Sequence, residues 1–395
     1  MIESVFLVGM HFIRILVAAV LLSGFASLDL HAQKKKKPGE DEGYIPVVAP
    51  ENKKKKKDED TTQSLAPIRE LPIAIAADTD RIAFQVSPLS SKGLFSPQTR
   101  EALKYLLHNS HGTIVKLRAF VSGSGDMRRV GDLVSEAFAD KRSGMPVLSV
   151  VQVGGLPLEG AQVVIESTEV DKKTVNPNGL AFVSGQAAPT VADSVALVKK
   201  ALDAGGMQPE DTLRVTCFVS SLDEQRNTYE LMKSSFAGAA LNYVQMQREP
   251  VRPAAECEAV ARARSGAPEP ISFLNPDGLD RSPQNSQMVI VNSPKLVFTG
   301  TQLAFGRQDS DVKLAFERLG KALSSANSRF VHVVMSHLYL TSGGLAAKIR
   351  EVRAAFHAGG SPPASTILPF EGLPSLDASF AVDVIAVQDP GTAQR

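Results

Sequence analysis

The stretch LAFVSGQ, residues 180–186, opens an order of elements that recurs along the chain and decides the fold. Its alternating apolar residues predict a strand. From Val191 to Leu202 an apolar residue every three or four positions predicts a helix, which ends at Gly205-Gly206, where a helix C-cap is expected. A second strand (LRVTCFVSS, 213–221), a second helix (224–236) and two further strands (LNYVQMQ, 241–247, and ECEAVARA, from 256) complete the unit.

The same order recurs on both sides of this unit. Upstream it begins at RIAFQVSPLS (81–90), and downstream at KLVFTGTQLA (295–304). Each unit runs strand, helix, strand, helix, strand, strand. Because the strands alternate and each helix has one apolar face, we predict an α+β domain whose single sheet is covered on one side by two helices.

The repeat pattern divides the chain. We predict repeat 1 at residues 71–172, repeat 2 at 173–264 and repeat 3 at 287–390, with a linker at 265–286. Two lysine runs, each followed by acidic residues, fill most of residues 33–70. A segment this charged cannot bury enough apolar surface to fold, so we predict a disordered linker. The alternative for this segment is a tether to an anionic surface.

The N-terminal residues 1–32 are predicted to be a secretory signal. Arg14 precedes the apolar run ILVAAVLLSGFA (15–26), and Ala32 is a small residue at a plausible cleavage point. The run is short for a spanning helix, which needs about 20 residues. An uncleaved anchor is the alternative, and either Met1 or Met10 can be the start. We expect export, to the periplasm or outside the cell, and no stable membrane span.

Composition excludes some classes of partner. The formal net charge is +1 and Trp is absent, so neither a basic field nor a base-stacking surface points to nucleic acid. No histidine, cysteine or acidic residues recur at metal-ligand spacing, and we expect neither a metal nor a cofactor. The partner that remains is a small-molecule ligand.

Several short motifs resemble the Rid family, also called YjgF-like or L-PSP endoribonuclease-like. In repeat 2 they are FVSGQ (182–186) and ECEAV (256–260), and in repeat 1 VQVGGLP (151–157) and IES (165–167). Repeat 3 carries GLP (372–374) and VDV (382–384), so the resemblance covers about residues 75–390. It implies three chorismate-mutase-like (Rid-type) domains. Family members assemble as homotrimers with ligand clefts between subunits, so three copies imply a pseudo-trimer within one monomeric chain.

The chemistry that the resemblance implies is hydrolysis of reactive imines or enamines, that is, a 2-iminoacid or enamine deaminase. An arginine on the third strand holds the substrate carboxylate in the family. The matching positions here hold Leu148, Leu241 and, depending on one residue of offset, Ala364 or Ser365. Arg248 and Arg252, at the end of the same hairpin in repeat 2, are the substitute cations that the sequence offers. The missing arginine predicts little hydrolysis of imines made from simple amino acids, and a less acidic, more apolar ligand beside the leucines.

Other family positions are retained. Glu166, Glu258 and Asp383 stand at the glutamate of the last strand, where the resemblance implies a catalytic carboxylate that orients water. Ser184, Gly185 and Gln186 stand where the cleft-lining strand approaches the ligand.

Cys217 and Cys257 are the only cysteines of the chain. In the family topology their strands are neighbours, and alternation places both side chains on the helix-covered face. A cross-strand disulfide and two buried free thiols both fit, and we favour the thiols.

Three functions remain from the sequence. The first is an exported deaminase of altered specificity, the second a binding protein that holds small metabolites at the clefts between repeats, and the third a non-catalytic structural or protein-interaction module. Ribonuclease activity has the least support because the repeats lack basic patches. The sequence identifies neither the ligand nor an active cleft.

Overall fold

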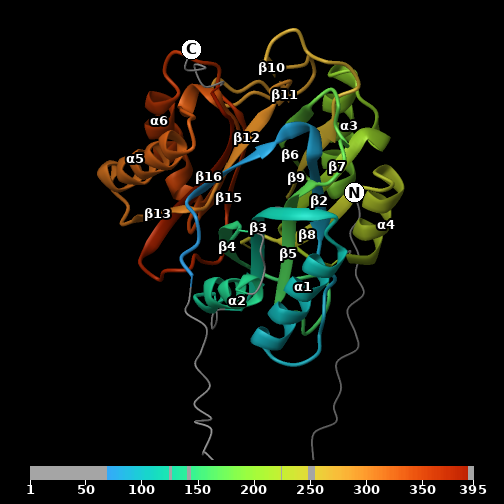
Figure 1. Cartoon of the computed structure of the whole chain (residues 1–395), viewed down its shortest axis with the longest axis vertical. Coiled ribbons are helices and arrows are strands. Elements are labelled where there is room, and N and C mark those ends of the chain that lie inside the picture. The colour runs from blue at the N-terminus through green and yellow to red at the C-terminus, as the bar shows by residue number, and fades with distance from the viewer. Residues whose placement is uncertain (1–68, 124–126, 140–143, 224, 248–253, 390–395) are drawn as a thin grey trace, which may run out of the picture. The chain divides into compact units, whose positions relative to one another are not determined.

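The computed structural model describes residues 69–123, 127–139, 144–223, 225–247 and 254–389. They form three sheets, and each sheet packs against its own pair of helices (Figure 1). The predicted fold class, three α+β units each with one helix-covered sheet, is confirmed. No helix in the described part of the chain is long and apolar enough to span a bilayer, and the run at 15–26 lies outside that part.

Repeat 1 forms a four-stranded sheet in the order β2-β5-β3-β4. Strands β3 and β4 pair in parallel and the other pairs are antiparallel. The helices bury their apolar faces, including Leu103, Leu106 and Val134, against Leu117 and Ile165 of the sheet. The elements are η1 (Thr79–Arg81), β2 (Ile82–Val86), α1 (Phe95–Asn109), β3 (Gly112–Ser122), α2 (Arg129–Phe138), β4 (Val147–Val153) and β5 (Val163–Asp171).

Repeat 2 follows the same plan. Helix α3 begins where the hydroxyl of Thr190 accepts a hydrogen bond from the backbone of Asp193, and it ends at Gly205, followed by Gly206 with φ +76°, as predicted. The elements are β6 (Leu180–Ala188), α3 (Val191–Ala204), η2 (Pro209–Asp211), β7 (Thr212–Val219), α4 (Gln225–Ser235), β8 (Ala240–Gln245) and β9 (Ala255–Arg262).

In repeat 3 the predicted first strand is split into β12 and β13, which pair with the same strand, β16, at different places. The elements are β12 (Lys295–Thr299), β13 (Gln302–Phe305), α5 (Asp309–Ser325), η3 (Phe330–His332), β14 (Val333–Leu340), η4 (Gly343–Leu345), α6 (Ala346–Phe356), β15 (Ala364–Pro369) and β16 (Ala378–Val387).

Three strands were not predicted: β1 (Ala74–Asp78), β10 (Ile271–Leu274) and β11 (Met288–Val291). Strand β1 lies at the start of the predicted repeat 1 but pairs with β12 of repeat 3, so that its blue arrow runs beside the orange strands in Figure 1. Strand β11 lies at the start of the predicted repeat 3 and pairs with β6 of repeat 2. Strand β10 lies in the expected linker and pairs with β11. Periodicity missed them because they are short and their partners belong to other segments of the chain.

The repeats contact one another through the VQVGGLP motif and its counterparts. Gln152 of repeat 1 pairs with Gly372 of repeat 3, and Gln245 of repeat 2 pairs with Gly155 of repeat 1. The backbone N–H of Gln247 donates to the carbonyl of Pro369 at 3.0 Å, which completes the cycle. A Cβ built on Gly372 would lie 2.3 Å from the Gln152 side-chain oxygen, so a larger residue here would displace the Gln152 side chain.

The two cysteines form a disulfide. Cys217 and Cys257 lie directly opposite each other on β7 and β9, with their Cα atoms 4.0 Å apart. Both side chains belong to the helix-covered core of repeat 2, on the face that alternation predicted. Our preference for two free thiols was wrong, because this register brings the two sulfurs together.

Candidate functional site

The three carboxylates expected to be catalytic occupy one position in the three sheets. Glu166 lies opposite Arg118, Glu258 opposite Thr216 and Asp383 opposite His337 in the antiparallel pairs. Their exposed fractions are 3%, 0% and 0%. We call these three carboxylates, with the cations and hydroxyls described next, the central polar cluster.

Each carboxylate of the central polar cluster is held by the next repeat in the cycle. Glu166 accepts hydrogen bonds of 2.7 Å from Thr216 and Asn242 of repeat 2. Glu258 accepts one of 2.6 Å from Thr366 of repeat 3. Asp383 accepts one of 2.6 Å from Ser149 of repeat 1. Since Ser149, Asn242 and Thr366 stand at the same register position, the contacts obey an approximate threefold relation.

Buried cations neutralise these acids. Arg118 contacts Glu166 at 2.7 Å and Glu258 at 2.8 Å, and Lys116 contacts Asp383 at 2.8 Å. Burial alone would raise the pKa of Glu166, but Arg118 and Arg214 outweigh it, so the pKa of Glu166 lies below its ordinary value. Burial likewise opposes the charge of Asp383, yet Lys116 and His337 hold its pKa far below the ordinary value.

This placement differs from the expectation that Glu166, Glu258 and Asp383 orient a water molecule in a cleft. All are buried and hydrogen-bonded, and the two inter-repeat cavities described below are lined by other residues. These carboxylates hold the repeats together. Separating two repeats would leave a buried charge without its partner, and an unpaired charge in the interior is costly.

The first inter-repeat cavity, the 2/3 cleft, lies between repeats 2 and 3 and has a volume of about 480 Å³. Gly185 and Gln186, two of the residues expected to approach a ligand, line it. Ser184 forms the wall behind them: its hydroxyl donates to the carbonyl of Ser286 at 2.6 Å and accepts from the backbone of Ser365 at 2.7 Å. The segment between β10 and β11 closes one side, where Gln287 accepts a 2.8 Å hydrogen bond from Gln186.

A buried arginine faces the 2/3 cleft. Arg353 of α6 is 3% exposed, and its guanidinium donates to the hydroxyls of Ser336 (3.2 Å) and Ser365 (2.7 Å) and to the carbonyl of Gln284. Among the described residues it forms no ion pair with a carboxylate. Burial and the neighbouring Arg350, which also lines the cleft, lower the pKa of Arg353 to about 10.

Two acids line the 2/3 cleft together with these arginines, Glu256 and the exposed Asp280. Glu256 of β9 lines the 2/3 cleft, and burial together with Glu258 raises its pKa to about 8, against the opposing effect of Arg350. A Cβ built on Gly185 would lie 1.9 Å from a Glu256 carboxylate oxygen, so the glycine makes room for the carboxylate. The sequence analysis did not identify Glu256 as a cleft residue. Glu256 nevertheless lies on the same face of the strand as Glu258, opposite the face of Cys257. The sequence analysis also passed over Arg353 because that residue belongs to a helix without a recognised motif.

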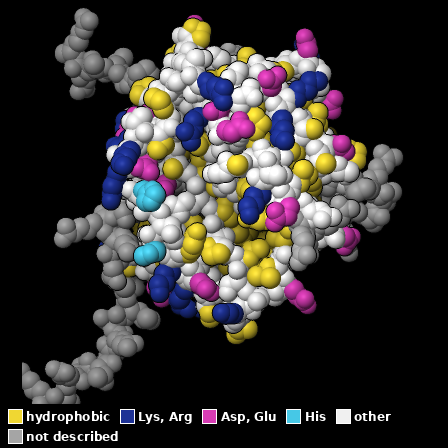
Figure 2. Space-filling model, turned by 90° about the vertical axis from the view of Figure 1, so that its right-hand side faces the viewer, with side chains coloured by type: hydrophobic (Ala, Val, Ile, Leu, Met, Phe, Trp, Pro, Cys, Tyr) yellow, Lys and Arg dark blue, Asp and Glu magenta, His cyan; other side chains and the backbone are white. Residues whose placement is uncertain are grey.

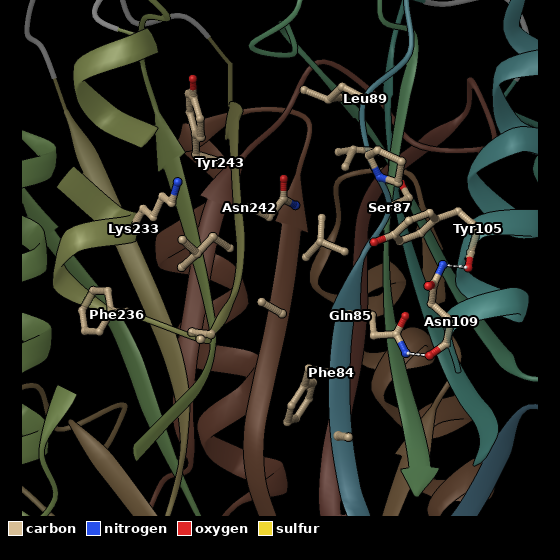
Figure 3. A pocket seen from close by; sticks show the side chains of 18 of the residues that line it. Phe84, Gln85, Ser87, Leu89, Tyr105, Asn109, Lys233, Phe236, Asn242 and Tyr243 are labelled. Carbon is tan, nitrogen blue, oxygen red and sulfur yellow. Dashed lines mark hydrogen bonds between the residues drawn. The ribbon is translucent and has the colours of Figure 1, made fainter. Parts of the chain in front are cut away.

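The second cavity, the 1/2 cleft, lies between repeats 1 and 2 and has a volume of about 830 Å³ (Figure 3). Leu241, which was expected at a ligand-binding position, lines it. Leu148 packs in the core of repeat 1 instead, and its carbonyl accepts a 3.2 Å hydrogen bond from Thr301 of repeat 3. Direct backbone contact therefore joins these two repeats at the third interface. Arg248 and Arg252 lie outside the described residues.

Comparison with solved structures gives matches to chains of one family. The conserved Rid-family protein YyfB of unknown function from Yersinia pestis is 19% identical, with a TM-score of 0.29, and the match covers 30% of this chain and 99% of that one. A YjgF-family member from Neisseria meningitidis is 21% identical over 30% of this chain and 94% of its own, with a TM-score of 0.23. The E. coli protein TdcF, solved with bound serine, is 19% identical over 24% and 80%, with a TM-score of 0.22.

This chain is similar to Rid-family proteins. Each match covers about a third of the chain, and the likeness concerns the fold alone. No family model matches the sequence, and no curated protein does. Any statement about ligand or activity therefore depends on the residues of the clefts.

Proposed function

We propose that the protein binds a small carboxylate-bearing metabolite in the 2/3 cleft and hydrolyses its imine or enamine form. The observation that carries this proposal is Arg353, a buried guanidinium that faces the cavity without an acidic partner among the described residues. A buried charge lacking a counter-ion is costly, and a ligand carboxylate would supply the counter-ion.

The cleft offers the groups that imine hydrolysis needs. Water adds to the C=N carbon, the nitrogen leaves as ammonia, and the carbon becomes a carbonyl, so the nitrogen must gain protons that the water loses. With a pKa of about 8, Glu256 holds a proton at neutral pH that it can donate to the imine nitrogen. The resulting carboxylate then accepts a proton from the attacking water. Arg350 and Arg353 position the substrate through its carboxylate.

Two sequence features extend the proposal. The N-terminal run at 15–26 supports export of the protein, and the three successive repeats support action as a single chain. The face shown in Figure 2 carries basic and acidic side chains interspersed, a surface better suited to a small-molecule function than to nucleic-acid binding.

Release of ammonia and keto acid from freshly generated 2-imino acids tests the activity, and calorimetric titration with the corresponding stable 2-keto acids tests binding. Arg353→Gln and the less buried Arg350→Gln should each weaken keto-acid binding at least about tenfold. Glu256→Gln should reduce hydrolysis about 10²-fold while leaving binding largely intact. Glu136→Gln, at an exposed position of α2, is the control and should change neither.

Hydrolysis and carboxylate binding in the 2/3 cleft can be refuted separately. Keto-acid binding without any ammonia release above the buffer rate would leave a binding protein and refute the hydrolase. Binding that is equally strong in both arginine variants would show that the carboxylate is held elsewhere.

A further inference from the structure

The 1/2 cleft contains a buried acid in place of a buried arginine. Glu169 of β5 is 2% exposed and lines this cavity. One carboxylate oxygen accepts a 3.1 Å hydrogen bond from the side-chain amide of Gln85. The other oxygen is buried and has no hydrogen-bond partner in the described structure. Half of the carboxylate is therefore left unsatisfied beside a cavity.

No cation of the described chain neutralises Glu169. The nearby imidazole of His111 contacts Asp171 instead, at 3.7 Å. Lys233 lines the same cavity from α4, on the wall that faces repeat 1, and its side chain is exposed (Figure 3). A carboxylate removed from water without a cation and with one acceptor unused favours a ligand that brings both a positive charge and a hydrogen-bond donor.

Aromatic rings surround the rest of the 1/2 cleft. Phe84 and Tyr105 lie on the repeat 1 side, with Phe236 and Tyr243 opposite them (Figure 3). Phe84 already stacks on the guanidinium of Arg214, 5.3 Å away. Tyr105, 41% exposed, and Tyr229, 44% exposed, are the rings that a ligand can reach from solvent. Aromatic faces attract both apolar groups and cations.

We propose that the 1/2 cleft is a second ligand site, which binds a primary monoamine in its ammonium form. The ammonium group donates to Glu169, and an aromatic or aliphatic body lies against Tyr105 and Tyr229. Lys233 on the facing wall repels a second positive charge, which favours a monoamine over a polyamine. The proposal does not depend on the function proposed for the 2/3 cleft, since the two cavities share no lining residue.

Titration calorimetry on the full chain tests the amine site with three probes of one skeleton: 2-phenylethylamine, 2-phenylethanol and 3-phenylpropionate. Only the amine should bind saturably at the 1/2 cleft. Glu169→Gln, which keeps the shape and removes the charge, should weaken amine binding at least about tenfold. Tyr105→Leu, at an exposed position that tolerates substitution, should weaken it several-fold. The exposed-site control Glu136→Gln should not change it.

A crossed comparison separates the two sites. Arg353→Gln should leave amine binding unchanged, and Glu169→Gln should leave keto-acid binding unchanged. The amine site is refuted if the alcohol binds as well as the amine, or if Glu169→Gln and Tyr105→Leu both retain wild-type amine affinity. Absence of saturable amine binding to the wild-type protein would refute it as well.

Discussion

The guanidinium of Arg353 donates a 2.7 Å hydrogen bond to the hydroxyl of Ser365, at a strand position where the family resemblance implies an arginine. The register of the parallel strand pairs selects Ser365 over Ala364 as the equivalent of Leu148 and Leu241. Ser365 lies one residue before Thr366, just as Leu148 precedes Ser149 and Leu241 precedes Asn242. A cation therefore reaches the 2/3 cleft from α6 instead of from the strand. The expectation of a less acidic, more apolar ligand was based on the strand positions alone.

Gly185 should be sensitive to the smallest substitution. In Gly185→Ala the added Cβ collides with the Glu256 carboxylate, 1.9 Å away, and displaces it from the cleft. We expect a loss of hydrolysis of about 10²-fold, as for removal of a general acid–base group. Gly343→Ala is the matched control, since its Cβ meets nothing within 4 Å. Equal activity of the two variants would contradict the role given to Glu256.

The stability of the protein should depend on the buried cations that pair with the carboxylates of the central polar cluster. Arg118→Met removes the cation nearest to both Glu166 and Glu258, leaves only the more distant Arg214 beside them, and should lower the free energy of unfolding by about 3–5 kcal/mol. Arg100→Met removes an arginine from an exposed pair with Glu136 and should cost at most about 1 kcal/mol. Urea unfolding of both variants gives the comparison. A small effect at Arg118 would show that the cluster contributes little to joining the repeats.

The disulfide predicts that mass spectrometry after alkylation under denaturing, non-reducing conditions will find no free thiol. The two cysteines are 40 residues apart, and closing a loop of that length stabilises the folded chain by about 4 kcal/mol in the chain-entropy model. The double variant Cys217→Ala, Cys257→Ala should therefore unfold at a lower urea concentration. Detection of two alkylated cysteines in the oxidised protein would contradict the pairing.

Glu256 should make stability depend on pH. Its pKa is about 8 in the folded protein against the ordinary value of 4.5, so the folded state binds the proton more tightly. The contribution of Glu256 to the free energy of unfolding is complete below pH 4.5 and is lost as the pH rises through 8. One pKa unit corresponds to about 1.4 kcal/mol, so the loss is at most about 5 kcal/mol. Unfolding measured from pH 5 to 9 should show this decline, and Glu256→Gln should remove it.

Light scattering should report one chain per particle. The contacts that run from repeat 1 to 2, from 2 to 3 and from 3 to 1 are all made within one chain, and β1 adds to the sheet of repeat 3. An obligate trimer of chains would contradict a pseudo-trimer formed within the chain.

Local pattern was enough to predict most elements. The helix from Val191 ended at Gly205 as expected, because apolar spacing and the C-cap glycine are properties of neighbouring residues. Strands β1, β10 and β11 were not predicted. A strand of four or five residues is defined by the strand with which it pairs, and that strand belongs to another segment of the chain. The candidate site divides in the same way. Gly185 and Gln186 were predicted to line a cleft, whereas Glu256, Glu169 and Arg353 were not predicted at all.

The sequence by itself determined the three α+β units, their order and the face on which the cysteines lie, since periodicity and repeated motifs are short-range signals. The tertiary structure alone decided which polar groups are buried together. Glu256 and Glu258 are two residues apart on one face of β9, yet one lines a cleft and the other joins the central polar cluster. That difference depends on which strands and helices of the other repeats pack against each end of β9, and such long-range packing leaves no local pattern in the chain.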